Sequence, residues 1–124
     1  MLATECYLAK EIGREAMQTL TLSATRENED IVICACGEID FSTAYELTDI
    51  VERETDDSIF AVVIDLGQVT FIDSEAVKTL MRLRRNLIQQ RSIPLYLRNC
   101  SKQVTRILSI LAVDSIFINC TDFS

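Results

Sequence analysis

Hydrophobic and polar residues alternate over 20–25, LTLSAT, and an almost continuous apolar run then opens the segment 31–40, IVICACGEID. The alternation has the period of a half-buried strand, whereas the continuous run is typical of a strand covered on both faces. The polar segment 26–30 between them has the composition of a turn. We therefore predict an antiparallel hairpin whose second strand is central in the sheet, with Gly37 marking a bulge or a close backbone approach.

Three later segments show the period of amphipathic helices, with their apolar residues on one stripe. They are residues 42–54, the segment that follows FIDS and ends near Gln90, and residues 101–113. Between the helices, residues 58–66 form an apolar run rich in Val and Ile, as in a buried parallel strand, and residues 93–99 alternate again. A short closing strand is expected at 115–120.

Helices between successive strands require crossover connections, which make those strands parallel. We therefore predict an α/β fold with a mixed, mainly parallel sheet of four to five strands and amphipathic helices packed on it. The 124 residues are enough for one domain with a sizeable core, which we place at 20–124. Residues 1–19 form an N-terminal extension, and Leu8, Ile12 and Ala16 would share one face if it were helical.

The chain carries a net charge of −7, which narrows the range of partners. An acidic surface repels the phosphates of nucleic acids and anionic membranes, and no cluster of Lys and Arg offsets this repulsion. No apolar run approaches the roughly 20 residues that span a bilayer, and no secretory signal is visible. We expect a cytoplasmic protein with no nucleic-acid partner and no membrane insertion.

Most catalytic signatures are missing. The chain has no histidine, so no Ser-His or Cys-His pair can form, and it has no phosphate-binding GxxxxGK[ST] loop. The five cysteines lack CxxC spacing and are expected to be reduced and buried, with no metal site and no cofactor. An enzyme-like alternative rests on Asp40, Asp65 and Asp73, which follow predicted strands at the edge where parallel sheets bind ligands. Two of these carboxylates could share a metal or a proton, although turn and cap roles are commoner.

Ser74 lies where a strand and its loop pass into the second predicted helix. The first turn of a helix has unpaired backbone N–H groups and the positive end of the helix dipole, so it would accommodate a phosphate on this serine. The simpler interpretation is that Asp73 or Ser74 only caps the helix, an arrangement that contributes about 1 kcal/mol. Spacing alone leaves both interpretations open.

Three stretches resemble a known family in the correct order along the chain: GEIDFSTAYEL, VVIDLGQVTFIDS and ILAVDSIFIN. From about residue 20 to residue 121 the sequence is similar to the STAS domain family, specifically to bacterial anti-sigma factor antagonists. The resemblance implies a small mixed sheet with helices and a binding module without catalytic activity. It implies as partners an anti-sigma factor that is also a serine kinase, and a serine phosphatase that reverses the modification.

Carried onto this chain, the resemblance makes Ser74 the phosphoacceptor and Asp73 its neighbour at the helix start. Asp40 matches an acidic residue near the acceptor, and Asp40, Asp73, Ser74 and Glu75 would form the partner-binding edge. The chain departs from the family pattern after Ser74, where Glu75 and Ala76 replace the usual Ser or Thr and Gly. An alternative within the fold is a non-switching scaffold or accessory subunit of a stress-signalling assembly or a lipid transporter.

A basic stripe runs along the second predicted helix and includes Lys78, Arg82 and Arg85. It could meet an acidic partner, but a solvated helix face with cations toward its C-terminal half is the commoner explanation. Self-association of the chain also remains open.

Overall fold

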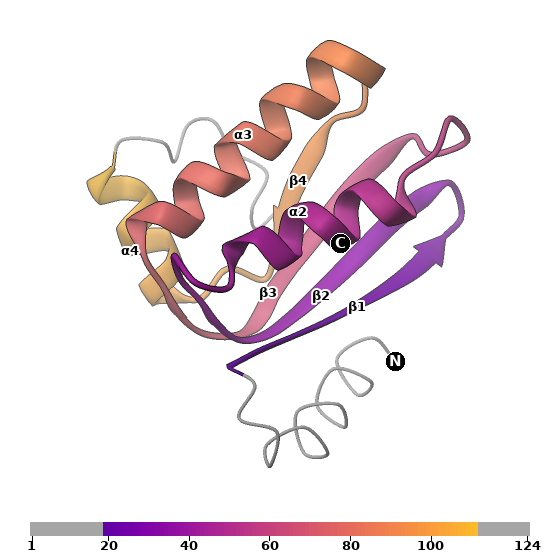
Figure 1. Cartoon of the computed structure of the whole chain (residues 1–124). Coiled ribbons are helices and arrows are strands. Elements are labelled where there is room, and N and C mark those ends of the chain that lie inside the picture. Colours follow the sequence, from indigo (N-terminus) through magenta and orange to yellow (C-terminus); the bar gives the residue numbers. More distant parts are fainter. Residues whose placement is uncertain (1–18, 112–124) are drawn as a thin grey trace.

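A computed structural model describes residues 19–111 of the chain (Figure 1). Strands and helices follow one another in the predicted order. The elements are β1 (Leu20–Glu27), β2 (Asp30–Ile39), α2 (Ala44–Glu54), β3 (Ala61–Ile72), α3 (Ser74–Arg91), β4 (Leu95–Arg98) and α4 (Lys102–Ile110). The expected closing strand at 115–120 and all but the last residue of the extension at 1–19 lie outside the described residues.

The four strands form one sheet in the order β1-β2-β3-β4. β1 pairs antiparallel with β2, from Leu20 opposite Gly37 to Glu27 opposite Asp30, so the predicted hairpin is confirmed. β2 pairs parallel with β3, and β3 pairs parallel with β4. The sheet is therefore mixed and mainly parallel, with β2 in its centre as predicted and β3 beside it.

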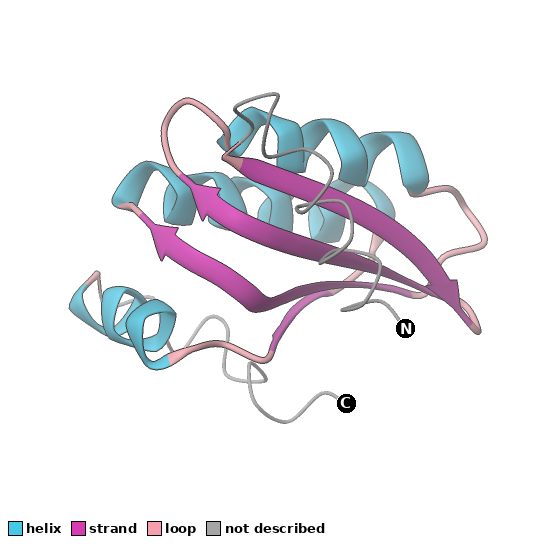
Figure 2. Cartoon of the chain, turned by 90° about the horizontal axis from the view of Figure 1, so that it is seen from below, coloured by secondary structure: helices cyan, strands magenta, loops and turns pink. Residues whose placement is uncertain are grey.

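The helices α2 and α3 lie side by side on one face of the sheet (Figures 1 and 2). α2 and α3 bury the apolar stripes that their sequences predict, whereas α4 buries only Val104 and Leu108 and Leu111 is 38% exposed. The buried helix residues include Leu47, Ile50 and Val51 of α2, Val77, Leu80, Leu83 and Leu87 of α3, and Val104 and Leu108 of α4. Among the described helices, none is both long enough and apolar enough to cross a membrane.

The opposite face of the sheet carries a second, smaller apolar cluster. It consists of Val32, Cys34, Cys36 and Val63, with Tyr96 packed against it. None of the four buried residues is more than 1% exposed. The continuous apolar run of β2 is thus explained, because its residues alternate between two buried faces.

β3 is longer than the sequence pattern predicts. The apolar run ends at Leu66, so we expected a loop over GQVTF, but the strand continues to Ile72. Val69 and Ile72 are buried there, and the segment pairs with β2 from Cys36 to Ile39. Polar residues between the buried ones interrupt the apolar pattern, so the sequence does not indicate a strand here. Pairing with β2 keeps the segment extended.

The cysteines agree only partly with the expectation of reduced thiols. Cys34 and Cys36 are free and buried, as expected. Cys100 is disulfide-bonded. The expectation failed here because the spacing of cysteines along a chain does not reveal which of them meet in the fold.

Gly37 lies where the register between β2 and β3 shifts, as expected of a bulge. Its φ is +113°, a conformation that residues with a Cβ rarely adopt. A Cβ at this position would also clash with the backbone oxygen of Thr19, which accepts a hydrogen bond from the N–H of Glu38. Both predicted roles of this glycine, a bulge and a close backbone approach, are confirmed.

Replacing Gly37 with alanine should therefore destabilise the domain by about 2 kcal/mol or more, because strain and clash act together. Asn28→Ala is the matched control, since Asn28 has a φ of 60° in the hairpin turn and should cost only about 1 kcal/mol. Urea unfolding of both variants measures the difference. Equal stability of Gly37→Ala and the unmodified chain would contradict the close approach.

Candidate functional site

Two aspartates meet at the carboxyl ends of the central strands. Ile39 and Ile72 are paired in the parallel ladder, so the residues that follow them, Asp40 and Asp73, leave the sheet side by side. The N–H of Asp73 donates to the backbone oxygen of Ile39 at 3.2 Å, which joins the two strand ends directly. α3 then begins at once with Ser74.

Asp73 is the N-cap of α3, and its carboxylate also holds the loop after β2. Oδ1 accepts from the N–H of Ala76 at 2.9 Å, and Oδ2 accepts from the N–H of Phe41 at 3.0 Å. One carboxylate therefore satisfies a free N–H of the first helical turn and an N–H of a segment 32 residues earlier. The Asp73 carboxylate thus connects the start of α3 to the loop that follows β2.

Asp40 organises the turn that leads into α2. Its Oδ1 accepts from the backbone N–H and hydroxyl of Ser42, at 2.9 and 2.7 Å, and from the same two groups of Thr43, each at 3.2 Å. The Ser42 hydroxyl, followed by the Ser42 N–H, lowers the pKa of Asp40 below its ordinary value, because these bonds favour the ionised form. Asp40 is thus held as a carboxylate.

Ser74 and Glu75 are exposed on the first turn of α3. Within residues 19–111 the Ser74 hydroxyl has no hydrogen-bond partner. Glu75 forms an exposed ion pair with Lys78, with Oε2 and Nζ 3.3 Å apart. The four residues expected at the partner-binding edge, Asp40, Asp73, Ser74 and Glu75, therefore lie at one edge of the domain.

Asp65 does not join them. Since β3 continues to Ile72, Asp65 lies in the middle of the strand, where its Oδ2 accepts from Arg98 Nε at 3.1 Å and from Asn99 Nδ2 at 3.0 Å. The enzyme-like alternative gains no support from Asp40 and Asp73 either, because their carboxylates accept from the backbone of the loops around them. Within the described part of the chain, no three His, Cys, Asp or Glu residues gather in a way that could hold a metal.

Sequence reasoning missed a groove beside this edge. It has a volume of about 320 Å³ and lies between α2 and α3. Phe41 and Tyr45 line it and are 77% and 61% exposed, and Glu75 and Arg82 line its other side. The only signal in the sequence is that Phe41 and Tyr45 fall outside the apolar stripe of the first helix, because that stripe begins at Ala44.

A family model of the STAS domain matches residues 22–123. The chain belongs to the STAS domain family. Among curated proteins, none matches this sequence significantly.

Solved structures resemble this STAS domain in fold. An anti-sigma factor antagonist from Mycobacterium paratuberculosis is 26% identical, with a TM-score of 0.69, over 79% of this chain and 82% of that one. The anti-sigma factor antagonist SpoIIAA in its unphosphorylated form is 17% identical, with a TM-score of 0.61, over 77% and 83% of the two chains. The murine anion transporter Solute Carrier 26 family member A9 is 15% identical, with a TM-score of 0.65, over 90% of this chain and 22% of the transporter.

The similar structures belong to two kinds of protein, anti-sigma factor antagonists and an anion transporter. The STAS fold occurs both in free-standing antagonists and as a part of a much longer anion transporter. Membership of the family therefore establishes the architecture of the sheet and helices. The partner of this STAS domain has to be inferred from its exposed edge.

The hydrogen bonds around Asp40 predict an unusual titration. Its lowered pKa means that the carboxylate stabilises the folded domain above the unfolded pKa, near 3.8, and that this contribution is lost as pH falls through the lower folded value. Ser42→Ala should raise the pKa of Asp40 toward its ordinary value, because it removes the hydroxyl bond. Carboxyl NMR titration measures both values, and an Asp40 that titrates above 3.8 in the unmodified chain would contradict the geometry.

The two bonds of Asp73 predict a graded effect on stability. Asp73→Ala should cost about 2 kcal/mol, and Asp73→Asn about half as much, because an amide keeps only one acceptor oxygen. Ser101→Ala is the control, since Ser101 caps α4 through a single bond to the N–H of Val104. It should cost about 1 kcal/mol in the same denaturant titration. If Asp73→Ala costs no more than Ser101→Ala, the bond to Phe41 contributes nothing.

Proposed function

We propose that this STAS domain is an anti-sigma factor antagonist in bacterial signalling. Its partner is an anti-sigma factor that is also a serine kinase, and binding to it releases a sigma factor for transcription. Phosphorylation of Ser74 ends the contact, and a serine phosphatase restores it. The proposal places the protein in the cytoplasm and gives it no catalytic activity, cofactor, nucleic-acid partner or membrane insertion.

One observation carries this proposal: an exposed serine hydroxyl at the first position of a helix, beside a cluster of carboxylates. Ser74 projects from the edge where Asp40 and Asp73 end the central strands. A kinase can reach such a hydroxyl without unfolding the domain. The likeness to SpoIIAA supports the proposal, because that antagonist has been solved in an unphosphorylated and a phosphorylated form.

The electrostatics of the edge explain how the modification would weaken binding. A phosphate adds about −1.5 to −2 charges, next to Glu75 and close to Asp40 and Asp73. The N-terminus of α3 favours negative charge, so the domain itself tolerates the phosphate. A docked partner would instead meet a concentrated negative charge that must lose its water, which opposes association.

In this proposal the anti-sigma factor binds in the groove between α2 and α3, and a phosphate on Ser74 weakens that binding. Phe41 and Tyr45 are exposed aromatic side chains of the kind that dominate protein interfaces, and Arg82 offers a guanidinium beside them. Glu75 lines the same groove, only one residue from Ser74. Partner binding and the charge on Ser74 are thus directly coupled. Asp40 and Asp73 act by positioning the loops that carry this surface.

A second candidate function rests on Glu75. Glu75 places a permanent carboxylate next to the acceptor, and Lys78 at 3.3 Å offsets only part of its charge because the ion pair is exposed to solvent. A partner adapted to this charge would bind constitutively. This alternative is the non-switching scaffold or accessory subunit, and the likeness to an anion transporter is compatible with it.

Phosphorylation of Ser74 separates the two functions. With the anti-sigma factor/kinase of the native organism and ATP, mass spectrometry should find phosphate on Ser74, and Ser74→Ala should abolish it. Phosphorylated protein should bind the kinase at least about tenfold more weakly by calorimetry, because like charges at an interface cost several kcal/mol. Ser109→Glu, which adds a charge on the exposed face of α4, should bind as the unmodified chain does.

Two results would favour the scaffold instead. One is the absence of phosphate on Ser74 after incubation with a kinase that binds the domain. The other is unchanged affinity once Ser74 carries a phosphate.

A further inference from the structure

The two helices on the sheet carry opposite charges. α2 has four acidic residues and one basic residue, whereas α3 has five basic residues and one acidic residue. The charged residues are Glu46, Asp49, Glu52, Arg53 and Glu54 of α2, and Glu75, Lys78, Arg82, Arg84, Arg85 and Arg91 of α3. A chain with a net charge of −7 thus keeps half of the ten cations of residues 19–111 on a single helix.

The basic helix has an apolar hollow on the side that faces away from α2. Thr79, Arg82 and Asn86 line grooves shared with α2, so Met81, Arg84 and Ile88, about half a turn away, point to the other side. The last three residues, with Arg85 and Gln89, surround a hollow of about 290 Å³. Ile88 is 40% exposed, and within the described residues neither Arg84 nor Arg85 forms an ion pair.

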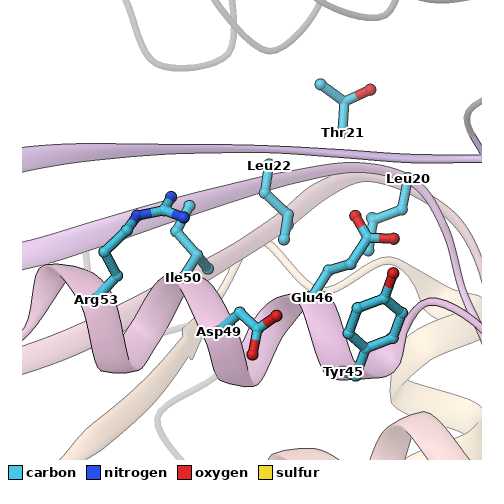
Figure 3. Close-up of a pocket in the computed structure, with 8 residues that line it drawn as sticks. All are labelled: Leu20, Thr21, Leu22, Tyr45, Glu46, Asp49, Ile50 and Arg53. Atoms are coloured by element: carbon cyan, nitrogen blue, oxygen red, sulfur yellow. The ribbon is translucent and has the colours of Figure 1, made fainter.

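The acidic helix has a groove on the opposite side of the helical layer. It lies between α2 and the outer strand β1, and its volume is about 530 Å³ (Figure 3). Glu46 reaches from α2 toward β1, and Asp49 lies on the helix beside it. Half-buried Leu22 of β1 supplies most of the accessible apolar part, because Leu20 and Ile50 are only 2% and 5% exposed. Arg53 lies at one end, where its Nε contacts Glu54 at 3.3 Å. The groove therefore combines carboxylates with an apolar surface.

The carboxylates of this groove are poorly compensated. Partial burial raises the pKa of Glu46 above its ordinary value, and the charge of Asp49 adds to the rise. A cation that enters the groove would offset both causes, because its charge favours the ionised carboxylate. A guanidinium suits this place, because it is always charged and can bind a carboxylate through two parallel hydrogen bonds.

We propose that copies of this chain associate head to tail, with the basic hollow of α3 in one copy docking on the acidic groove between α2 and β1 of the next. Arg84 and Arg85 would pair with Glu46 and Asp49 while Ile88 and Met81 cover the half-buried Leu22. The two surfaces lie on opposite sides of one layer, so the contact is heterologous and a pair of copies retains one free surface of each kind.

This contact does not depend on the proposed function, although its acidic groove shares Tyr45 and Asp49 with the groove between α2 and α3. At physiological salt, charges farther apart than about 8 Å are largely screened, whereas paired charges in contact are screened much less. The repulsion expected from a net charge of −7 is therefore reduced more than the attraction between the two surfaces. A chain that is acidic overall can still associate through them.

Complementary charge variants test this arrangement by sedimentation velocity over a range of protein concentrations. The unmodified chain should show reversible association. Arg84→Glu/Arg85→Glu and Glu46→Arg/Asp49→Arg should each raise the dissociation constant at least about tenfold. An equal mixture of the two should regain association with the variants alternating, because the two intact surfaces are complementary and so are the two reversed ones. The chain with all four substitutions should associate again.

Lys102→Glu/Arg106→Glu is the matched control, since it changes the net charge by the same amount on α4 and should leave association unchanged. Circular dichroism verifies that each variant is folded, and Arg84→Gln/Arg85→Gln serves if the reversal unfolds the chain. A monomer at every concentration overturns the proposal. So does a mixture of the two variants that stays monomeric while the unmodified chain associates.

Discussion

The parallel pairing of β2 with β3 is the constraint on which the site depends. It places Ile39 opposite Ile72, so that both strands end at the same level and the next residues are Asp40 and Asp73. Buried residues on both faces of β2 and β3 hold this register, since a slip by one residue would move every side chain to the wrong face. The bulge at Gly37 completes the alignment just before the strands end.

The edge formed by Asp40, Asp73, Ser74 and Glu75 contains two residues that hold the fold and two that are exposed to solvent. The carboxylates of Asp73 and Asp40 accept hydrogen bonds from backbone N–H groups. These bonds fix the start of α3 and the turn before α2. Ser74 and Glu75 are left exposed on this rigid support, next to the groove of Phe41 and Tyr45. A charge added at Ser74 can therefore change what the surface binds without changing the fold beneath it.

Patterning predicted the hairpin, the parallel strands and the helices, because each of these elements buries either a regular stripe or a continuous run of apolar residues. It failed for the second half of β3, where Gln68 and Thr70 interrupt the apolar run and only pairing with β2 extends the strand. The same error placed Asp65 at a strand end, although it lies within the strand and pairs with Arg98. The exposed aromatic groove left no periodic signal, since it arises from two helices that meet only in the folded chain.

The central claim is that a phosphate on Ser74 acts at the surface and leaves the core intact. It is tested most directly by amide hydrogen exchange on protein that carries phosphoserine at position 74. The account predicts changes confined to the start of α3, the turn at Asp40 and the adjoining groove, with protection of β2 and β3 unaltered. Loss of protection throughout these two strands would contradict it, because the modification would then act by loosening the fold.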